Sequence, residues 1–381
     1  MHFELDADQQ QLQDSLRRLL DTEASFERRR QVAASEAGWN PALWRALGGL
    51  GVTAITLPEA HGGFGQAPVA LLPVLQELGR ALALEPFLAS AVLGATAVAR
   101  AGTQAQQQAV LPGVASATQV LAFAHDEPAG RHQPLWVETS ARRVGDGWVL
   151  QGAKHNVLHG AAADLLVVSA RTQGDADDRE GLALFLVHGE QAGVQRTALR
   201  LIDDTPAAEI RLDGTTAQLL GEAGQGRAAI EAAQQAGLAA TCAEALGVAE
   251  RAYALTVDYV QTRQQFGRAI GANQALRHRV AEMRVALDMV RSAAMAGLLA
   301  LEIDDAEARW RELSRAKMLV ARHGTFVCQQ AIQLHGGIGM TLEYAAGHCL
   351  RRLTVLDQLF GDGPAHAARL GAALARDRTP A

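Results

Sequence analysis

The chain has 381 residues, enough to bury a sizeable core and to form two or three compact units. Its formal net charge is −6, with acidic and basic residues mixed along the sequence, which argues against nucleic acid as the main partner. The N-terminus lacks a basic stretch followed by an apolar one, and no apolar run reaches the ~20 residues needed to cross a bilayer. We therefore expect a globular protein without a membrane partner.

The three cysteines also bear on localisation. Cys242, Cys328 and Cys349 fall in helix-like sequence, without the spacing of a metal site. Reduced thiols of this kind are typical of the cytoplasm, which is where we expect the protein to act.

Residues 1–115 form the first of three expected domains and read as all-helical. Asp6 and Gln9 have the spacing of a capping box, so a helix should begin there. Asn40-Pro41 predicts a second helix start, because Asn caps helices and Pro fits their first turn. The glycine-rich segment Pro58–Gly65 should be a loop.

Residues 116–224 form the second expected domain and are rich in short β runs. Asp146-Gly147 is a hairpin-turn signal. Six runs without intervening helices predict an antiparallel sandwich or barrel. The runs are Val120–Ala124, Leu135–Thr139, Trp148–Gln151, Leu165–Ala170, Leu182–Val187 and Ile210–Leu212.

Residues 225–381 form the third expected domain, where the helical period returns. One apolar stripe steps by four and three, through Leu276, Val280, Met283, Leu287 and Val290. The fold class is therefore α+β: an N-terminal helical domain, a middle β-sandwich or barrel, and a C-terminal helical bundle.

Two motifs about 70 residues apart carry the chemistry of this bundle. Arg263–Gly267 reads Arg-Gln-Gln-Phe-Gly, and Gln333–Gly339 reads Gln-Leu-His-Gly-Gly-Ile-Gly. A guanidinium suits a pyrophosphate, and glycines let backbone N–H groups approach it. A glutamine amide suits a sugar or an adenine edge. Together they favour a flavin dinucleotide.

The order of the domains and the place of these motifs resemble the acyl-CoA dehydrogenase family over nearly the whole chain. The resemblance implies FAD, an acyl-CoA substrate, desaturation between Cα and Cβ, and an electron-transfer flavoprotein as a partner. It also implies that the C-terminal domain is a four-helix bundle that provides oligomer contacts. In the resulting dimer or tetramer, one subunit contacts the pyrophosphate and adenosine of its neighbour's flavin. In this chain, the residues that match the family positions making this contact are Arg263, Gln265, Phe266, Gln274, Gln333, Gly336 and Gly337.

The sequence departs from the family at the catalytic base, which is usually a glutamate. Counting from the Gly-Gly motif places Phe360 at the usual position, and counting back from Arg263 places Gly237 at the alternative one. Neither side chain accepts a proton. Asp362 is the nearest carboxylate and is the candidate base, although a loop or cap role also fits it. Glu231 is a further candidate, or else a solvated helix residue.

The sequence departs also where a subunit of this family contacts its own flavin and the thioester. The usual Thr and Ser of the middle domain are Asp126 and His132, and the usual Trp and Thr are Asn156 and Leu158. His125, His132 and His159 lack the spacing of metal ligands, so no metal is expected.

The replaced residues are therefore those that would contact the chain's own flavin. The retained residues are those that would contact a neighbouring subunit's flavin. A heteromer can divide these two functions between its chains. We expect the small, base-deficient subunit of a heteromer with a larger acyl-CoA dehydrogenase chain, acting on a dicarboxyl- or other functionalised acyl-CoA. The alternatives are an autonomous homotetramer that uses Asp362 or another relocated base, and a non-catalytic structural subunit.

Overall fold

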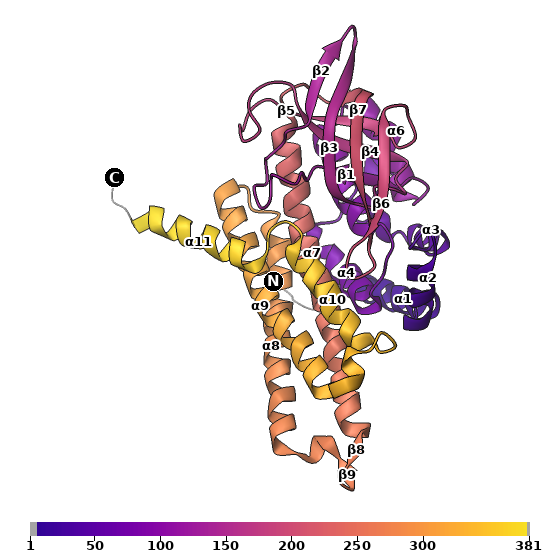
Figure 1. The fold of residues 1–381 in the computed structure, drawn as a ribbon, viewed down its shortest axis with the longest axis vertical. Coiled ribbons are helices and arrows are strands. Elements are labelled where there is room, and N and C mark those ends of the chain that lie inside the picture. The colour runs from indigo at the N-terminus through magenta and orange to yellow at the C-terminus, as the bar shows by residue number, and fades with distance from the viewer. Residues whose placement is uncertain (1–5, 379–381) are drawn as a thin grey trace. The chain divides into compact units, whose positions relative to one another are not determined.

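The computed structural model describes residues 6–378. The chain has the expected order of a helical N-terminal part, a β part and a helical C-terminal part (Figure 1). Its contacts define two compact units. We call residues 6–29, 68–83 and 238–378 the helical unit, and Arg30–Ala67 with Leu84–Gly237 the barrel unit. No helix in residues 6–378 is long and apolar enough to cross a membrane.

The helical unit consists of long helices and one small hairpin. Its first elements are α1 (Ala7–Glu23), the single-turn η3 (Pro68–Leu71), α4 (Leu72–Ala81) and the larger part of α7 (Gly226–Thr262). Then follow β8 (Gln264–Gln265), β9 (Arg268–Ala269), η5 (Ile270–Ala272), α8 (Gln274–Ala300), α9 (Ala306–His335), η6 (Gly336–Met340), α10 (Ala345–Gln358) and α11 (Gly363–Arg378). Figure 1 shows the β8–β9 hairpin at the far end of the bundle, between α7 and α8.

Local sequence signals account for where these helices begin and which face they bury. Asp6 and Gln9 form the predicted capping box at the start of α1, with each side chain bonded to the other's backbone N–H. On α8 the predicted apolar stripe is confirmed, because Met283, Leu287 and Val290 are buried.

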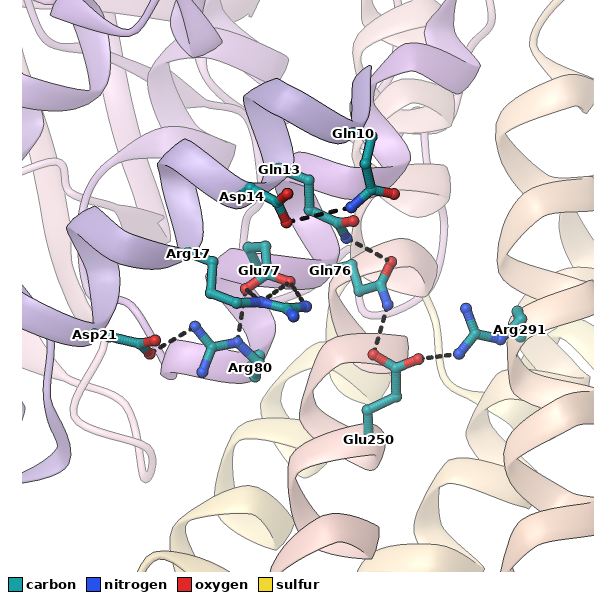
Figure 2. Close-up of polar contacts among 10 residues, drawn as sticks. All are labelled: Gln10, Gln13, Asp14, Arg17, Asp21, Gln76, Glu77, Arg80, Glu250 and Arg291. Atoms are coloured by element: carbon teal, nitrogen blue, oxygen red, sulfur yellow. Dashed lines mark hydrogen bonds and ion pairs between the residues drawn. The ribbon is translucent and has the colours of Figure 1, made fainter. Parts of the chain in front are cut away.

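Two polar networks join helices that are distant in the sequence (Figure 2). In the first, the buried Glu77 of α4 binds Arg17 of α1 and Arg80 of its own helix. In the second, the side-chain amide of Gln76 donates to Glu250 of α7 at 2.6 Å, and Glu250 also binds Arg291 of α8. These contacts group α1 and α4 with the C-terminal helices rather than with their neighbours in sequence.

The barrel unit combines short helices with one sheet. The helices are α3 (Pro41–Gly49), η1 (Val52–Ala54), η2 (Glu59–His61), the π-helical η4 (Phe87–Gly94), α5 (Ala95–Ala101), α6 (Gln104–Ala115) and most of α2 (Phe26–Ala34). The strands are β1 (Leu121–Ala124), β2 (Ser140–Val144), β3 (Gly147–Leu158), β4 (Leu165–Arg171), β5 (Leu182–His188), β6 (Val194–Arg200) and β7 (Pro206–Leu220). Asn40 caps α3 as predicted.

Among the described residues, the strands form one seven-stranded sheet that closes on itself. Strands β4, β2, β3, β7 and β5 pair in that order, and β5 pairs back with β4. The prediction of a purely antiparallel sheet is wrong at strand β4. Both β1 and β2 run parallel to β4, and β2 pairs with it through Ser140 and Arg171. The buried side chains of Leu150, Leu166, Phe185 and Ile210 contribute to the barrel core.

Two further strand predictions differ from the structure. Leu135–Thr139 is not a strand, because the backbone N–H groups of Glu138 and Thr139 donate to the Glu127 carboxylate instead of to a neighbouring strand. Strand β2 begins only at Ser140. Strand β6 was missed, because its residues are mostly exposed and lack an apolar alternation.

Candidate functional site

The first part of the candidate site is the β8–β9 hairpin at the end of α7. Phe266 and Gly267 form its two-residue turn, with φ of 53° and 77°, as a type I′ turn requires. A non-glycine residue in this region is strained by about 1–3 kcal/mol, and the Phe266 side chain is also 100% exposed. Phe266 therefore combines backbone strain with an uncovered aromatic ring at the tip of this hairpin.

Arg263 and Gln265 belong to the same exposed segment. Arg263 ends the last turn of α7, where its backbone N–H donates to the carbonyl of Tyr259 at 2.8 Å. The Arg263 side chain has no ion pair or hydrogen bond among the described residues, so its guanidinium is available to a ligand.

The second part of the site is the turn that follows α9. Gly336 has a φ of 63° and ends the helix, which a residue with a side chain rarely does. A Cβ placed at Gly336 or at Gly337 would meet no atom within 4 Å, so the space over this backbone is open. Gln333 in the last turn of α9 and Gln274, the first residue of α8, are both exposed.

The third part is the loop between α10 and α11, which contains the position of the usual base. Phe360 lies there, half-buried, with a φ of 61°. Its carbonyl accepts from Nε2 of His366 at 3.0 Å, and Lys317 donates to the carbonyls of Leu356 at 2.5 Å and Leu359 at 2.9 Å. The loop is therefore held in place from α9 and α11, yet it presents a phenyl ring instead of a carboxylate.

Burial sets the charge of the two groups that hold this loop. It lowers the pKa of His366 to about 4, so the ring is neutral at pH 7. Burial also lowers the pKa of Lys317. Sequence reasoning missed both residues. Lys317 lies between buried apolar positions of α9, and a lysine within an apolar helix face was the sequence signal that could have identified it.

Asp362, the candidate base, caps a helix. Its Oδ1 accepts from the backbone N–H of Ala365 at 2.8 Å, and its carbonyl accepts from that of His366 at 3.1 Å. Asp362 therefore has the helix-cap geometry that was the predicted alternative to a role as catalytic base.

The alternative base position on α7 also lacks a carboxylate. Gly237 is buried, and Glu231, one and a half turns earlier, binds Arg227 at 3.2 Å on a partly exposed face. The buried carboxylate of α7 is Glu244, which sequence reasoning missed. Its Oε1 accepts from Nε of Arg352 at 2.7 Å, and both side chains are nearly inaccessible.

In the barrel unit, the four positions that depart from the family do not share one environment. Asp126 and His132 are exposed, whereas Leu158 is buried. Asn156 is half-buried with a φ of 49°, at a bulge where β3 shifts its register against β7.

The three histidines that neighbour these positions do not come together. His125 is buried and bonds Ser169 and the carbonyl of Pro134, while His159 packs edge-on against Trp39 at 6.0 Å between ring centroids. Within residues 6–378, no group of three or more His, Cys, Asp or Glu is placed to hold a metal ion.

A buried ion pair lies close to these positions. Lys154 Nζ donates to Oε1 of Glu127 at 2.7 Å, to Oγ of Ser169 at 2.9 Å and to the carbonyl of His125 at 3.1 Å. Lys154 is four residues after the buried Leu150 in β3. Because side chains alternate between the two faces of a strand, this even spacing was a sequence signal that Lys154 is also buried.

Comparison with known proteins agrees with this architecture. The N-terminal, middle and C-terminal domains of acyl-CoA dehydrogenase match residues 6–118, 122–215 and 224–374. The probable acyl-CoA dehydrogenase YngJ of Bacillus subtilis (strain 168) is 27% identical over 378 residues, which cover 97% of this chain and 98% of the relative.

Two solved structures are similar over almost their whole length. The ChsE4-ChsE5 complex from Mycobacterium tuberculosis is 27% identical with a TM-score of 0.88, covering 100% of both chains. The Tcur3481-Tcur3483 steroid ACAD is 30% identical with a TM-score of 0.84, covering 97% of this chain and 98% of that one.

The chain belongs to the acyl-CoA dehydrogenase family, since the three matched domains cover most of its length. It is an oxidoreductase of the acyl-CoA dehydrogenase type, and the cofactor of this family is FAD.

Proposed function

We propose that this chain is the base-deficient subunit of a heteromeric acyl-CoA dehydrogenase. In this assembly its helical unit contacts the pyrophosphate and adenosine of a flavin whose reactive ring and substrate lie in a larger partner chain. The observation that carries the proposal is the absence of a carboxylate at Phe360 and Gly237, together with the helix-capping role of Asp362. A carboxylate must remove the α-proton in this reaction.

The exposed residues of the helical unit fit the tail of a flavin dinucleotide. The open space over Gly336 and Gly337 lets a pyrophosphate approach their backbone, and the unpaired guanidinium of Arg263 supplies the opposite charge. Phe266 would cover the adenosine, and the amides of Gln265, Gln274 and Gln333 would bind its polar edges. When bound, FAD accepts the hydride from Cβ of the acyl group.

The barrel unit also supports a heteromer in which the partner chain contacts the reactive ring of the flavin. Asp126, His132, Asn156 and Leu158 replace the residues with which family members contact their own flavin and thioester. A carboxylate and a leucine cannot reproduce the hydroxyl contacts that the family makes there. We infer that this chain does not hold a reactive flavin of its own.

We propose a bulky or functionalised acyl-CoA as the substrate, with an electron-transfer flavoprotein as the acceptor. The motif Leu158-His159-Gly160 and the segment Leu359–Asp362 resemble the small subunit of pimeloyl-CoA dehydrogenase, which favours a dicarboxyl-CoA. The similarity to the Tcur3481-Tcur3483 steroid ACAD supports a bulky ring-bearing acyl group as the second candidate. Turnover of pimeloyl-CoA and of a steroid side-chain CoA thioester by the purified complex separates the two.

The test compares the chain purified alone with the chain copurified with the product of the adjacent open reading frame, the candidate for the larger partner chain. We expect no stoichiometric flavin and no activity alone, and fewer than one FAD per chain in an active complex. One FAD per chain and full activity of the chain alone would establish the autonomous homotetramer instead.

Arg263→Ala separates a flavin-binding subunit from a purely structural one. Loss of a charged hydrogen bond of about 1.5–3 kcal/mol should weaken FAD binding by the complex roughly 10–150-fold. Arg268→Ala is the matched control, because this residue lies in the same hairpin but directs its guanidinium to Asn273 at 2.9 Å. Equal FAD affinity of the Arg263→Ala and wild-type complexes would favour the structural subunit.

A further inference from the structure

The two parts of the flavin-tail site lie on different helices, and a cluster of three aromatic side chains connects them. Tyr259 lies in the last turn of α7, His335 ends α9, and Tyr344 immediately precedes α10. The rings of Tyr259 and His335 are 4.5 Å apart between centroids, and those of His335 and Tyr344 are 4.9 Å apart. His335 is thus enclosed between tyrosines from two other elements.

The hydrogen bonds of His335 determine its tautomer. Nδ1 lies 2.7 Å from the carbonyl of Ala331, which can only accept, so Nδ1 carries the proton. Nε2 lies 3.1 Å from the hydroxyl of Tyr344. Because burial lowers the pKa of His335, the ring is neutral, and Nε2 accepts from the Tyr344 hydroxyl.

Two residues of the cluster, Tyr259 and His335, lie directly beside groups of the proposed flavin-tail site. The carbonyl of Tyr259 accepts the backbone N–H of Arg263, at the base of the hairpin. His335 directly precedes Gly336-Gly337, and a Cβ at Gly339 would lie 3.1 Å from Cβ of His335. The turn after α9 is therefore packed closely on the His335 side chain, while its outer face over Gly336 and Gly337 is open.

We propose that His335 and Tyr344 are positioning residues for the flavin dinucleotide, which hold the Gly336-Gly337 turn in register with Arg263. This inference rests on the proposed function, since it concerns the same flavin. The exposed side chains of the site make few contacts with one another. Their mutual placement therefore depends on this aromatic cluster, in which His335 is buried and both tyrosines are half-buried. Within it, the Tyr344 hydroxyl bonds His335 and so joins the start of α10 to the end of α9.

Tyr344→Phe tests the proposal, because it removes this hydrogen bond and keeps the stacked ring. In the copurified complex we expect the Kd of FAD to rise about fivefold, as the loss of about 1 kcal/mol implies. At saturating FAD the kcat should be unchanged. Tyr253→Phe is the matched control, because Tyr253 lies on α7 outside the cluster and its hydroxyl has no hydrogen bond among the described residues. The FAD affinity of the Tyr253→Phe complex should equal that of the wild type.

A second measurement does not depend on FAD. Hydrogen exchange at the amides of residues 336–340 in the FAD-free complex should accelerate several-fold in Tyr344→Phe and not in Tyr253→Phe. Unchanged exchange and unchanged FAD affinity in Tyr344→Phe would overturn the positioning role. If Arg263→Ala weakens FAD binding in the same assay, only this inference fails. If neither variant changes FAD affinity, the proposed function fails as well.

Discussion

Lys154 and Glu127 form an ion pair in the barrel unit with a distance of 2.7 Å between Nζ and Oε1, and their side chains are 0% and 2% exposed. Glu127 also accepts from the backbone N–H groups of Glu138 and Thr139 at 2.5 and 3.0 Å. One buried carboxylate therefore satisfies both a lysine and the segment that would otherwise have continued strand β2 toward the N-terminus.

Removing one partner of this pair should destabilise the fold strongly. Lys154→Met leaves the Glu127 carboxylate buried without its counter-ion, so the free energy of unfolding should fall by about 3–5 kcal/mol. Urea denaturation followed by circular dichroism measures the change. Arg284→Ala is the control, because Arg284 and Asp288 form an exposed pair, and it should cost less than about 1 kcal/mol. Equal effects of the two substitutions would contradict the structural importance of the buried pair.

The same pair predicts a dependence of stability on pH. Burial alone would raise the pKa of Glu127, but the charge of Lys154 and the hydrogen bonds to the carboxylate lower it below its ordinary value of 4.5. Burial lowers the pKa of Lys154, and the charge of the Glu127 carboxylate and its hydrogen bond to Nζ oppose this shift.

Since the pKa of Glu127 is lower in the folded state, its contribution is fully present above about pH 4.5 and is lost as the pH falls through the folded value. The difference in unfolding free energy between wild type and Lys154→Met should therefore narrow between pH 7 and pH 3. Urea titrations at several pH values check this. A constant difference over that range would show that Glu127 is not the titrating group.

Asp362→Asn should leave turnover by the complex within about twofold of the wild type. The Asn amide oxygen accepts the Ala365 N–H as the carboxylate does, so α11 should keep its cap. Steady-state kinetics with flavin content measured in parallel checks the prediction. Loss of turnover with full flavin content would instead identify Asp362 as the catalytic base.

Gly337→Ala should weaken FAD binding without destabilising the chain. The added Cβ meets no atom of the chain within 4 Å, but it would stand where the proposed pyrophosphate approaches the backbone. We expect a rise in the Kd of FAD of about tenfold and a change in melting temperature of less than about 3 °C. Gly371→Ala is the control, because that glycine lies on α11 with equally open surroundings. An equal FAD affinity in both variants would exclude Gly337 from the site.

The sequence alone was sufficient for features that depend on short windows. The cap at Asp6, the apolar stripe on α8 and the order of helical, β and helical parts follow from residue types at fixed spacings, because such interactions join near neighbours in the chain. The absence of a carboxylate at Phe360 and Gly237 is likewise a fact of the sequence. These signals were enough to indicate the family and the flavin motifs.

Only the tertiary structure decided which groups meet across long separations. The enclosure of His335 between Tyr259 and Tyr344 and the ion pair of Arg17 with Glu77 depend on how distant helices pack. The loss of the strand predicted at residues 135–139 has the same cause, because a single buried carboxylate competes for its backbone N–H groups. Local propensity cannot reveal such competition, since the competing group is identified only when the chain has folded.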